Sequence, residues 1–561
     1  MRPRAGVAGT ERAVEAELGG AIRIKHAARG VWPMLMRCSA GLALVGLCTR
    51  TFAFPLYDPP LTAAPGPLLA PSTAGGSSGA ICTVPLVTTA ALNNYNEVVH
   101  EPWNGVPAAC DGGIHGERWD FITLDFEGAV EGVQFDRYGG LWFAGVELLR
   151  TTTPEPATGV DHGGTRWSIN KDITDYAYLF AHAIVGITNT SLTIPNTVTD
   201  VYTGTLYIRV TATFRMAETT TTKSMPRMIL PLLDPTASPW SITGLTNTSQ
   251  PLHRPFALSS AHVGKVKRLY LDIFVSNHGG SEEFWYQTDS AYREINVFID
   301  GCLAAAFYPA VVVYTGGICP LLWRPLVSLL ALDIPAYRID ITAFAGVIND
   351  GAAHTFSFNV VDGDPPKSSG VWYIDPVLIL ELELQDTDAS YSGSIDPKTC
   401  LSPSAAAATR TLKVDREGGS TSGSMTFSVS GTNGRSSCSH SYALAAENLQ
   451  PTDGTVSGTM STIVTTTRNG NESGPNQKFE APQVEDKQVW RYSVADESSF
   501  DSTASGTFLL KAKVNLTKER TKVIHQADGT ATVLAATLSQ NNSGLCGSVK
   551  TNPRRAFLTP D

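Results

Sequence analysis

The sequence predicts an all-β protein made of two tandem antiparallel jelly-roll or β-sandwich domains and an additional C-terminal β region. Charged residues make up 17% of the 561 residues, below the roughly 25% of an average soluble protein, so long helices held by salt bridges are not expected. Short runs rich in valine, threonine and aromatic residues are separated by glycine and proline turn signals, a pattern typical of β-sandwiches. The hydrophobic fraction of 42% is enough for globular cores and excludes wholesale disorder.

The N-terminal segment, residues 1–53, is not expected in the mature protein. Residues 1–33 show neither a folded pattern nor a targeting signal, and we interpret them as a spurious extension. A short apolar run over residues 39–48 has the build of a secretory signal peptide. We therefore expect the natural start at Met34 or Met36 and a secreted protein, with a vacuolar location as the alternative. A type II membrane anchor is the competing interpretation, although roughly ten apolar residues are too few to span a bilayer.

Composition and strand pattern divide the rest of the chain into five parts. Residues 54–81 are rich in proline, glycine and serine and predict a flexible leader. Residues 82–240 form the expected first jelly roll and residues 250–385 the second, with strand-like runs such as VYTGTLYIRVTATFR and HTFSFNVV. A linker is expected at residues 386–410, and the C-terminal β region at residues 411–561.

Charge, hydropathy and motifs exclude several classes of function. The net charge is −10 and there is no basic block, so no nucleic-acid partner is expected, because phosphate binding needs a basic face. No run of about 18 apolar residues follows the signal, so the mature chain should not span a membrane. The signatures of serine hydrolases, zinc proteases and nucleotide-binding enzymes are missing, and the histidines are isolated. We therefore expect neither a metal nor another cofactor.

Cysteines and glycosylation sequons fit an oxidising, extracellular compartment. Seven of the nine cysteines lie beyond the signal segment, and the local pairs Cys82–Cys110 and Cys302–Cys319 are the expected disulfides. Because seven is odd, one thiol stays free or pairs elsewhere. Five N-x-Ser/Thr sequons are the expected glycosylation sites: Asn189, Asn247, Asn471, Asn515 and Asn541.

Two stretches carry the functional signal. The first is GVQFDRYGGLWFAGVELLRTTTPEP at residues 132–156. The second is EEFWYQTDSAYREINVFIDG at residues 282–301, which leads into VYTGGICPLLWRPLVS at residues 313–328. Both place carboxylates beside aromatic residues and arginines. That composition suits a site that processes glycans, since sugar rings stack on aromatic rings and carboxylates move protons.

These stretches resemble the plant and fungal acid peptide:N-glycanases, the peptide-N4-(N-acetyl-β-glucosaminyl)asparagine amidase A family. The resemblance covers roughly residues 82–385 and rests on YRE-x-x-V-x-x-DG and TGG-x-x-P-x-x-WRP. It implies an enzyme that hydrolyses the amide between asparagine and the innermost N-acetylglucosamine of an N-glycan. The substrates would be N-glycosylated peptides or glycoproteins, and the products an aspartate-containing peptide and a glycosylamine.

The resemblance also implies catalytic carboxylates. A more distant likeness joins the chain to bacterial glycoamidases built from two jelly rolls, in which a W-D-R-Y segment carries the principal catalytic aspartate. The matching F-D-R-Y of this chain makes Asp136 the expected catalytic residue. The second acidic residue of that bacterial family lies at the start of the second jelly roll, and here Glu282, Glu283 and Glu294 all remain candidates. At most one of Glu282 and Glu283 should face the site if they lie on a strand.

Four further residues are expected to bind substrate. Arg137 and Arg293 could hold carboxylate or carbonyl oxygens through charge-assisted hydrogen bonds. Trp323 and Arg324, which follow the Gly-Gly turn, are placed to contact the chitobiose core of the glycan. Each residue also has a structural interpretation. The Asp136–Arg137 pair could be a strand-end ion pair, and Trp323 could be core packing, because a tryptophan buries a large area.

Two other functions stay open from the residues alone. A glycosidase would also use paired carboxylates but would cut a bond between two sugars. A secreted glycan-binding protein without catalysis could be built on the same jelly rolls. Only amide hydrolysis converts the asparagine of a glycopeptide to aspartate, so the peptide product separates the three functions.

Overall fold

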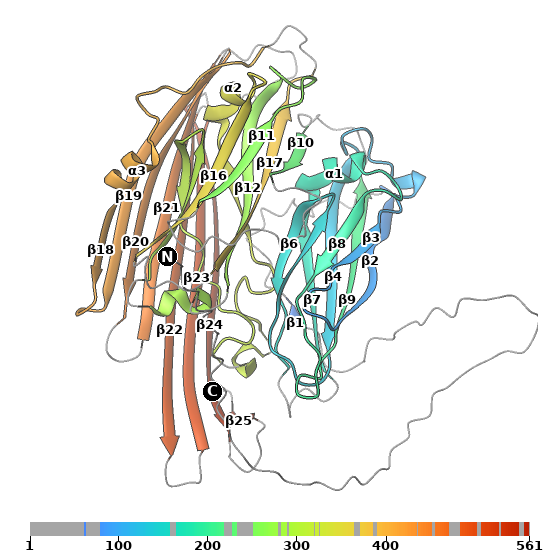
Figure 1. Ribbon diagram of the computed structural model, residues 1–561, viewed down its shortest axis with the longest axis vertical. Helices are drawn as coiled ribbons and strands as arrows, with labels where there is room; N and C mark the ends of the chain where they lie inside the picture. The colour runs from blue at the N-terminus through green and yellow to red at the C-terminus, as the bar shows by residue number, and fades with distance from the viewer. Residues whose placement is uncertain are drawn as a thin grey trace, which may run out of the picture. The chain divides into compact units, whose positions relative to one another are not determined.

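The computed structural model describes most of the chain beyond the leader (Figure 1). The described residues are 61–62, 79–156, 164–217, 227–232, 251–278, 282–288, 291–318, 320–324, 326–363, 371–384, 390–434, 436–450, 455–470, 483–501, 507–526, 529–548 and 555–559. The expected signal segment lies outside them. Within these ranges, no helix combines the length and the apolar character needed to cross a membrane.

The first β unit consists of two sheets around a shared core. The strands of the larger sheet are β1 (Leu61–Thr62), β2 (Ile81–Leu92), β4 (Trp119–Val130), β7 (Thr165–Asp172) and β9 (Leu206–Met216). The strands of the smaller sheet are β3 (Val99–Pro102), β5 (Tyr138–Phe143), β6 (Val146–Thr152) and β8 (Asn189–Thr193). The sheet orders are β1-β7-β4-β9-β2 and β3-β8-β5-β6, antiparallel except where β1 meets β7. The predicted alternation is confirmed in β9, which buries every second side chain as far as Phe214.

The second β unit also consists of two sheets. One contains β10 (Arg227–Pro231), β12 (Val266–His278), β15 (Ala336–Asp340) and β17 (Val371–Leu382). The other contains β11 (Leu252–Ala257), β13 (Arg293–Ile299), β14 (Cys302–Phe307) and β16 (Ala353–Asp362). The antiparallel orders are β10-β17-β12-β15 and β11-β16-β13-β14. β10 lies within the range predicted for the first jelly roll but pairs with β17, because an alternation pattern identifies a strand without showing which sheet its backbone joins.

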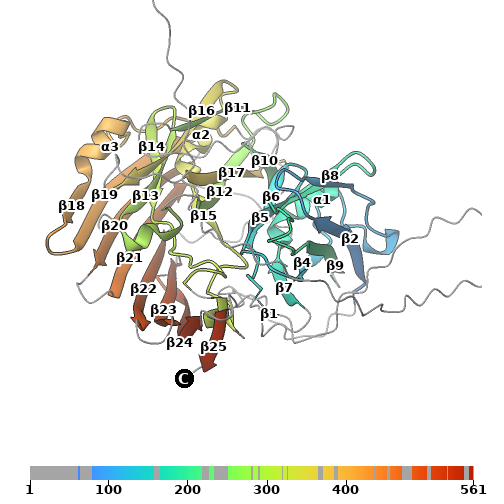
Figure 2. The same ribbon diagram turned by 60° about the horizontal axis from the view of Figure 1, so that its bottom comes forward.

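The C-terminal β region is one eight-stranded antiparallel sheet in which each strand pairs with the next (Figures 1 and 2, orange to red). Its strands are β18 (Thr411–Asp415), β19 (Ser420–Asn433), β20 (Ser436–Leu449), β21 (Thr455–Gly470), β22 (Gln483–Asp501), β23 (Thr507–His525), β24 (Ala531–Ser548) and β25 (Arg555–Thr559). β19 buries every second side chain, as the period of a strand requires. Phe427, Tyr442 and Trp490 of this sheet belong to the same core as Phe358 of β16. The C-terminal sheet therefore shares its core with the second β unit.

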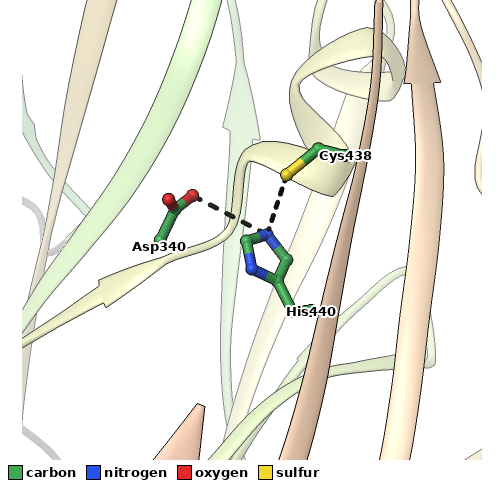
Figure 3. Close-up of side chains that lie close together, drawn as sticks. All are labelled: Asp340, Cys438 and His440. Carbon is green, nitrogen blue, oxygen red and sulfur yellow. Dashed lines mark hydrogen bonds and ion pairs between the residues drawn. The ribbon is translucent and has the colours of Figure 1, made fainter. Parts of the chain in front are cut away.

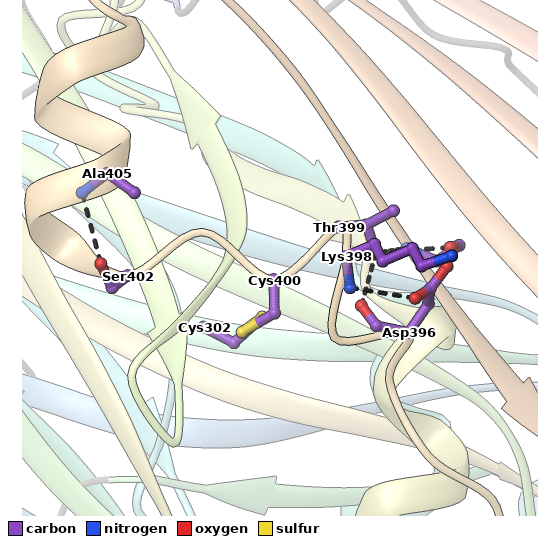
Figure 4. The surroundings of a disulfide bond; sticks show 8 residues. Cys302, Asp396, Lys398, Thr399, Cys400, Ser402 and Ala405 are labelled. Carbon is purple, nitrogen blue, oxygen red and sulfur yellow. Dashed lines mark hydrogen bonds between the residues drawn. A yellow bond between two sulfur atoms is a disulfide. The ribbon is translucent and has the colours of Figure 1, made fainter.

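Short helices connect the strands. They are α1 (Ala177–His182), α2 (Ala345–Ile348), α3 (Pro403–Thr409) and helical turns at Ala108–Cys110, Thr174–Tyr176, Glu282–Gln287, Pro320–Trp323 and Thr342–Phe344. The predicted linker contains α3, and Ser402 caps it by accepting a hydrogen bond from Ala405 N–H at 3.3 Å (Figure 4). Residues 390–410 are thus a structured connection.

The disulfides match the sequence prediction in one case and differ in the other. Cys82 bonds to Cys110 with a Cα–Cα distance of 6.2 Å, so this pair is confirmed. The expected partner of Cys302 is wrong, because Cys302 bonds to Cys400, which is 98 residues away in the sequence (Figure 4). Cys302 begins β14, and the structured connection before α3 passes beside it. Spacing in the sequence cannot show this proximity, and Cys319 lies outside the described residues.

Candidate active site

Asp136 lies in the loop that joins β4 to β5, on the first β unit. Its Oδ2 accepts a hydrogen bond of 2.8 Å from the backbone N–H of Gly316, which belongs to the second β unit. Burial raises the pKa of the Asp136 carboxyl group, while the Gly316 N–H and the charge of Arg137 act in the opposite direction. The two sequence stretches with the functional signal therefore meet at this carboxylate.

The Asp136 loop is held in place by a buried amide. Gln134 is almost fully buried, and its Nε2 donates to the carbonyl oxygens of Thr197 at 3.2 Å and Gly204 at 3.1 Å. Its Oε1 accepts from the backbone N–H of Phe135 at 3.1 Å and from Arg137 Nη2. The side chain of Gln134 thus orients Arg137. The Arg137 Nε is buried without a hydrogen-bond partner among the described residues.

Gly316 and Gly317 form the turn that approaches Asp136. The Gly317 N–H donates to Tyr314 O at 2.8 Å, and its carbonyl oxygen accepts from Trp323 Nε1 at 2.9 Å. A Cβ added at Gly316 would lie 2.7 Å from Asp136 Oδ1 and 2.6 Å from Glu155 Oε2. A glycine is therefore required by the close approach of the backbone to two carboxylates. This contact gives a physical reason for the first glycine of the TGG motif.

Glu155 is a carboxylate beside the Asp136 loop that the sequence analysis did not single out. It follows β6, in the TTTPEP sequence at the end of the first stretch. Glu155 Oε2 and Asp136 Oδ1 both lie within 2.7 Å of the position that a Gly316 Cβ would occupy, so the two carboxylates are neighbours. The backbone here is fixed by Arg324, whose Nη2 donates to Glu155 O at 2.9 Å. The TTTPEP sequence was the available signal, but the 19 positions from Asp136 to Glu155 say nothing about their distance in space.

The structure brings four predicted residues together: Asp136, Arg137, Trp323 and Arg324. Arg324 supports the main chain at Glu155, so it acts on the shape of the site. Trp323 is fully buried, and its indole N–H holds the Gly317 carbonyl. It leaves no ring face open for a sugar, which differs from the expected stacking on chitobiose. Trp323 therefore has the structural role considered above, because its ring is buried in the interior of the protein.

The other predicted residues lie in separate groups. Glu294 is fully buried and bonded to Arg410, with Arg410 Nη2 to Glu294 Oε1 at 2.5 Å, and it also accepts from Tyr292 OH. Arg293 pairs with Asp362 at 2.9 Å. These contacts join β13 to the α3 segment and to β16. The side chains of Glu282 and Glu283 lie outside the described residues.

Exposed aromatic rings surround the Asp136 loop. Phe135 is 47% exposed and its ring lies 5.1 Å from that of Tyr202. Tyr95 is 54% exposed. Burial lowers the pKa of Arg137, and Asp136, Tyr95 and Tyr202 oppose this effect, which places both phenol groups near the guanidinium. We call Phe135, Tyr95 and Tyr202 the aromatic surface; aromatic walls with a few polar groups are typical of ligand sites.

A buried polar network continues from the Asp136 loop into β5 and β6. Arg150 is fully buried and forms a two-pronged ion pair with Glu147, with Nε–Oε1 at 2.9 Å and Nη2–Oε2 at 2.6 Å. Its Nη1 donates to Ser276 Oγ at 3.2 Å and to Tyr373 O at 2.8 Å, both in the second β unit. Ser276 in turn donates to Tyr138 OH at 2.8 Å. This Arg150 network joins the two β units, and it includes Tyr138, which is two residues beyond Asp136 in the sequence.

Asp375 completes the Arg150 network. It is fully buried and accepts a hydrogen bond from Trp142 Nε1 at 2.8 Å. Burial, and secondly the charge of Glu147, raise the pKa of Asp375 well above its usual value. One arginine faces two carboxylates here, so the charged form of Asp375 is disfavoured in the folded protein.

Asp340, Cys438 and His440 form a cluster with metal-ligating atom types (Figure 3). His440 Nε2 lies 3.7 Å from Asp340 Oδ1 and 3.5 Å from Cys438 Sγ. Arg468 is already paired with Asp340 Oδ2, and burial raises the pKa of the Cys438 thiol to about 12. A neutral thiol beside an arginine is a poor ligand set, since metal binding requires the thiolate. The cluster serves to join β15 to the C-terminal sheet.

The asparagines of the sequons within the described residues differ in their exposure to solvent. Asn189 and Asn541 are exposed, and Asn515 is half-buried. Asn247 and Asn471 lie outside the described residues. Glycosylation of these five asparagines stays a prediction.

Known proteins match the chain over the same two β units. The profile of the family "Peptide N-acetyl-beta-D-glucosaminyl asparaginase amidase A" matches residues 71–378. The peptide-N4-(N-acetyl-β-glucosaminyl)asparagine amidase A of Prunus dulcis is 31% identical over 304 residues, which cover 48% of this chain and 50% of that protein. The chain thus aligns with about half the length of this relative.

Solved structures of lower identity also match. PNGase F, a glycosylasparaginase from Flavobacterium meningosepticum, matches with a TM-score of 0.37 and 11% identity, over 54% of this chain and 96% of that one. A second peptide-N4-(N-acetyl-β-D-glucosaminyl)asparagine amidase structure matches with a TM-score of 0.36 and 10% identity, over 54% and 96%. The family profile covers more than half of the chain, so the chain belongs to the peptide N-acetyl-β-D-glucosaminyl asparaginase amidase A family.

Proposed function

We propose that the chain is a peptide-N4-(N-acetyl-β-glucosaminyl)asparagine amidase that acts on N-glycosylated peptides or glycoproteins. The single observation that carries the proposal is the hydrogen bond from Gly316 to Asp136, which joins the two motif stretches across 180 residues. Membership of the amidase A family supports it. The enzyme hydrolyses the amide of the glycosylated asparagine and releases an aspartate-containing peptide and a glycosylamine.

We also propose that each β unit is a jelly roll. Successive strands of the first unit change sheets, from β4 to β5, from β6 to β7, from β7 to β8 and from β8 to β9. Crossovers of this kind, with two antiparallel sheets around one core, support a double Greek-key arrangement. A secreted or vacuolar location is part of the proposal and is supported by the Cys82–Cys110 and Cys302–Cys400 disulfides.

Asp136 is placed to activate water. Amide hydrolysis needs a base that takes a proton from water as the oxygen attacks the carbonyl carbon. The partly buried Asp136 has a raised pKa, and its ionised form is supported by the Gly316 N–H and Arg137. The guanidinium of Arg137, beside Asp136, can donate to the amide carbonyl oxygen or to a sugar hydroxyl. Breaking the C–N bond then requires that the departing nitrogen gain a proton.

The aromatic surface takes the role that the sequence analysis gave to Trp323. Phe135 lies on the loop of Asp136, and Tyr202 lies on the loop between β8 and β9, which Gln134 joins to it by hydrogen bonds to Thr197 and Gly204. Tyr95 lies on the loop between β2 and β3. The innermost sugars can stack their apolar faces on Phe135 and Tyr202 while the asparagine amide reaches Asp136. The peptide side of the bond then lies toward Gly316 and Glu155.

The test is incubation of the purified full chain with a biantennary glycopeptide, followed by mass spectrometry of the peptide. Amidase activity converts the glycosylated asparagine to aspartate, and Asp136→Asn should abolish the conversion while the protein remains folded. Two neighbouring carboxylates would also suit a glycosidase. That enzyme would leave a sugar on asparagine, and a glycan-binding protein would leave the glycopeptide unchanged; either result would overturn the proposal.

A further inference from the structure

We propose that Gln540 and Asn542 of the C-terminal sheet are positioning residues for the reaction. They hold the segment that presents the Gly316 turn to Asp136. The inference rests on the amidase function proposed above. Both residues lie on β24, outside residues 71–378, which the family profile matches. The inference makes the C-terminal sheet a part of the enzyme on which the geometry of the site depends.

Both side chains bond to the backbone of the segment that follows the turn. Gln540 makes two bonds, since its Oε1 accepts from Leu329 N–H at 2.5 Å and its Nε2 donates to Val327 O at 2.7 Å. Asn542 Nδ2 donates to Leu322 O at 2.8 Å. A side-chain amide can donate and accept at once, which suits it to bind irregular backbone that has no strand partner.

The strand register explains why these two amides face the segment. Residues two apart on a strand point to the same side, and Gln540 and Asn542 are half-buried while Asn541 between them is exposed. Across the sheet they pair with Leu516 and Val514, which are buried in the core. The two amides therefore lie on the inner face of β24, where the backbone groups of the segment need partners.

The same segment is also bonded to the first β unit. Thr315, directly before Gly316, donates its hydroxyl hydrogen to Thr153 O. Further along the segment, Ala331 O accepts from both the N–H and the hydroxyl group of Thr152, each at 2.9 Å. The segment thus joins β24 to the first β unit, and its position is set by both.

A short path connects the bonds from β24 to the turn. Leu322, which Asn542 holds, directly precedes Trp323. The indole N–H of Trp323 donates to Gly317 O at 2.9 Å, within the turn itself. Loss of the bonds from β24 would therefore loosen the turn.

The turn tolerates little displacement. The Gly316 N–H donates to Asp136 Oδ2 at 2.8 Å, and a Cβ on Gly316 would lie within 2.7 Å of both Asp136 Oδ1 and Glu155 Oε2. Two carboxylates are thus packed closely against this backbone. A shift of the turn either lengthens the hydrogen bond or brings the backbone still closer to a carboxylate oxygen.

Loosening of the turn should change the acid side of the pH profile. The Gly316 N–H supports the ionised form of Asp136, which is the form that can take a proton from water. Arg137 and Glu155 also lie beside Asp136, and the substitutions below leave both in place. Without the Gly316 N–H the pKa of Asp136 rises, so the acid limb of the kcat profile moves to higher pH.

The experiment uses the full chain with Gln540→Met and Asn542→Leu combined, which removes the three hydrogen bonds and keeps the side-chain length. Asn433→Leu is the matched control, because Asn433 is a buried amide of the same sheet that donates to Lys267 O of β12 at 2.7 Å. We expect the double variant to lose about 10-fold in kcat with KM little changed, and its acid limb to move to higher pH. The control should match the wild type in both.

Hydrogen exchange of the backbone over residues 313–318 tests the inference without catalysis. Exchange there should be faster in the double variant than in the wild type and the control. Equal exchange in all three proteins overturns the inference, and so does an unchanged kcat in a variant whose turn exchanges faster. An equal loss of kcat in the control also overturns it, because general destabilisation then explains the loss.

The two measurements separate the inference from the proposed function. A wild-type chain that leaves the asparagine of a glycopeptide unconverted contradicts the function, while the exchange data still show whether the turn depends on β24. If the double variant does not fold, Asn542→Leu alone is compared with Asn433→Leu in the same two measurements. Wild-type exchange and wild-type kcat in that single variant then contradict the role of Asn542.

Discussion

Replacing Arg150 by methionine should destabilise the fold strongly. Arg150 is fully buried and makes bonds to Glu147, Ser276 and Tyr373. The substitution keeps most of the side-chain volume but leaves Glu147 buried without its cation, beside Asp375. Breaking a buried ion pair by removing one partner costs about 3–5 kcal/mol. We therefore expect a loss of this size in the free energy of unfolding.

The assay is urea unfolding of the purified chain followed by intrinsic fluorescence, with Arg209→Met as the matched control. Arg209 also forms an ion pair, with Glu127, but the two side chains are 46% and 43% exposed. Exposed pairs contribute about 0–1 kcal/mol, so the control should unfold close to the wild-type midpoint. Equal changes in the free energy of unfolding for the two substitutions would refute the reasoning, because the buried ion pair would then contribute no more to stability than the exposed one.

Two further predictions follow from Asp375 and Phe135. Burial raises the pKa of Asp375 in the folded state above its value in the unfolded chain, so the stability of the fold should fall as the pH rises through the folded pKa. Asp375→Asn should flatten this fall when urea unfolding midpoints are measured from acidic to neutral pH. An unchanged slope in the variant would contradict the prediction. Phe135→Ala should raise KM for a glycopeptide about 3- to 10-fold with little change in kcat, whereas Ile114→Ala, an exposed apolar control in the same β unit, should leave KM unchanged.

The sequence was sufficient to predict a protein of antiparallel β-sheets, and its motifs single out Asp136 as the candidate catalytic residue. Alternation in runs such as β9 predicts strands because the period of a strand is fixed by its own backbone. Asp136 could be predicted because its motif is local. Sheet membership is not local, so the sequence does not show that β10 pairs with β17 or that Cys302 bonds to Cys400.

The remaining site residues depend on contacts that only the folded chain defines. Glu294 belongs to a motif, but its role depends on Arg410, which follows α3 and occupies both of its oxygens. The role of Trp323 depends on whether its ring face is exposed, and in the folded chain the ring is fully buried. Glu155 is one of many surface acids by sequence. Only the folded chain shows that its carboxylate and that of Asp136 both lie against Gly316.

The most direct test of the central claim is hydrolysis of a glycopeptide in water enriched in heavy oxygen, with the peptide product analysed by mass spectrometry. The proposed mechanism transfers the water oxygen to the peptide, so the former glycosylation site should be aspartate with one heavy oxygen. The Asp136→Asn variant should give no product. A peptide that still carries asparagine, with the heavy oxygen on the released sugar, would contradict the account.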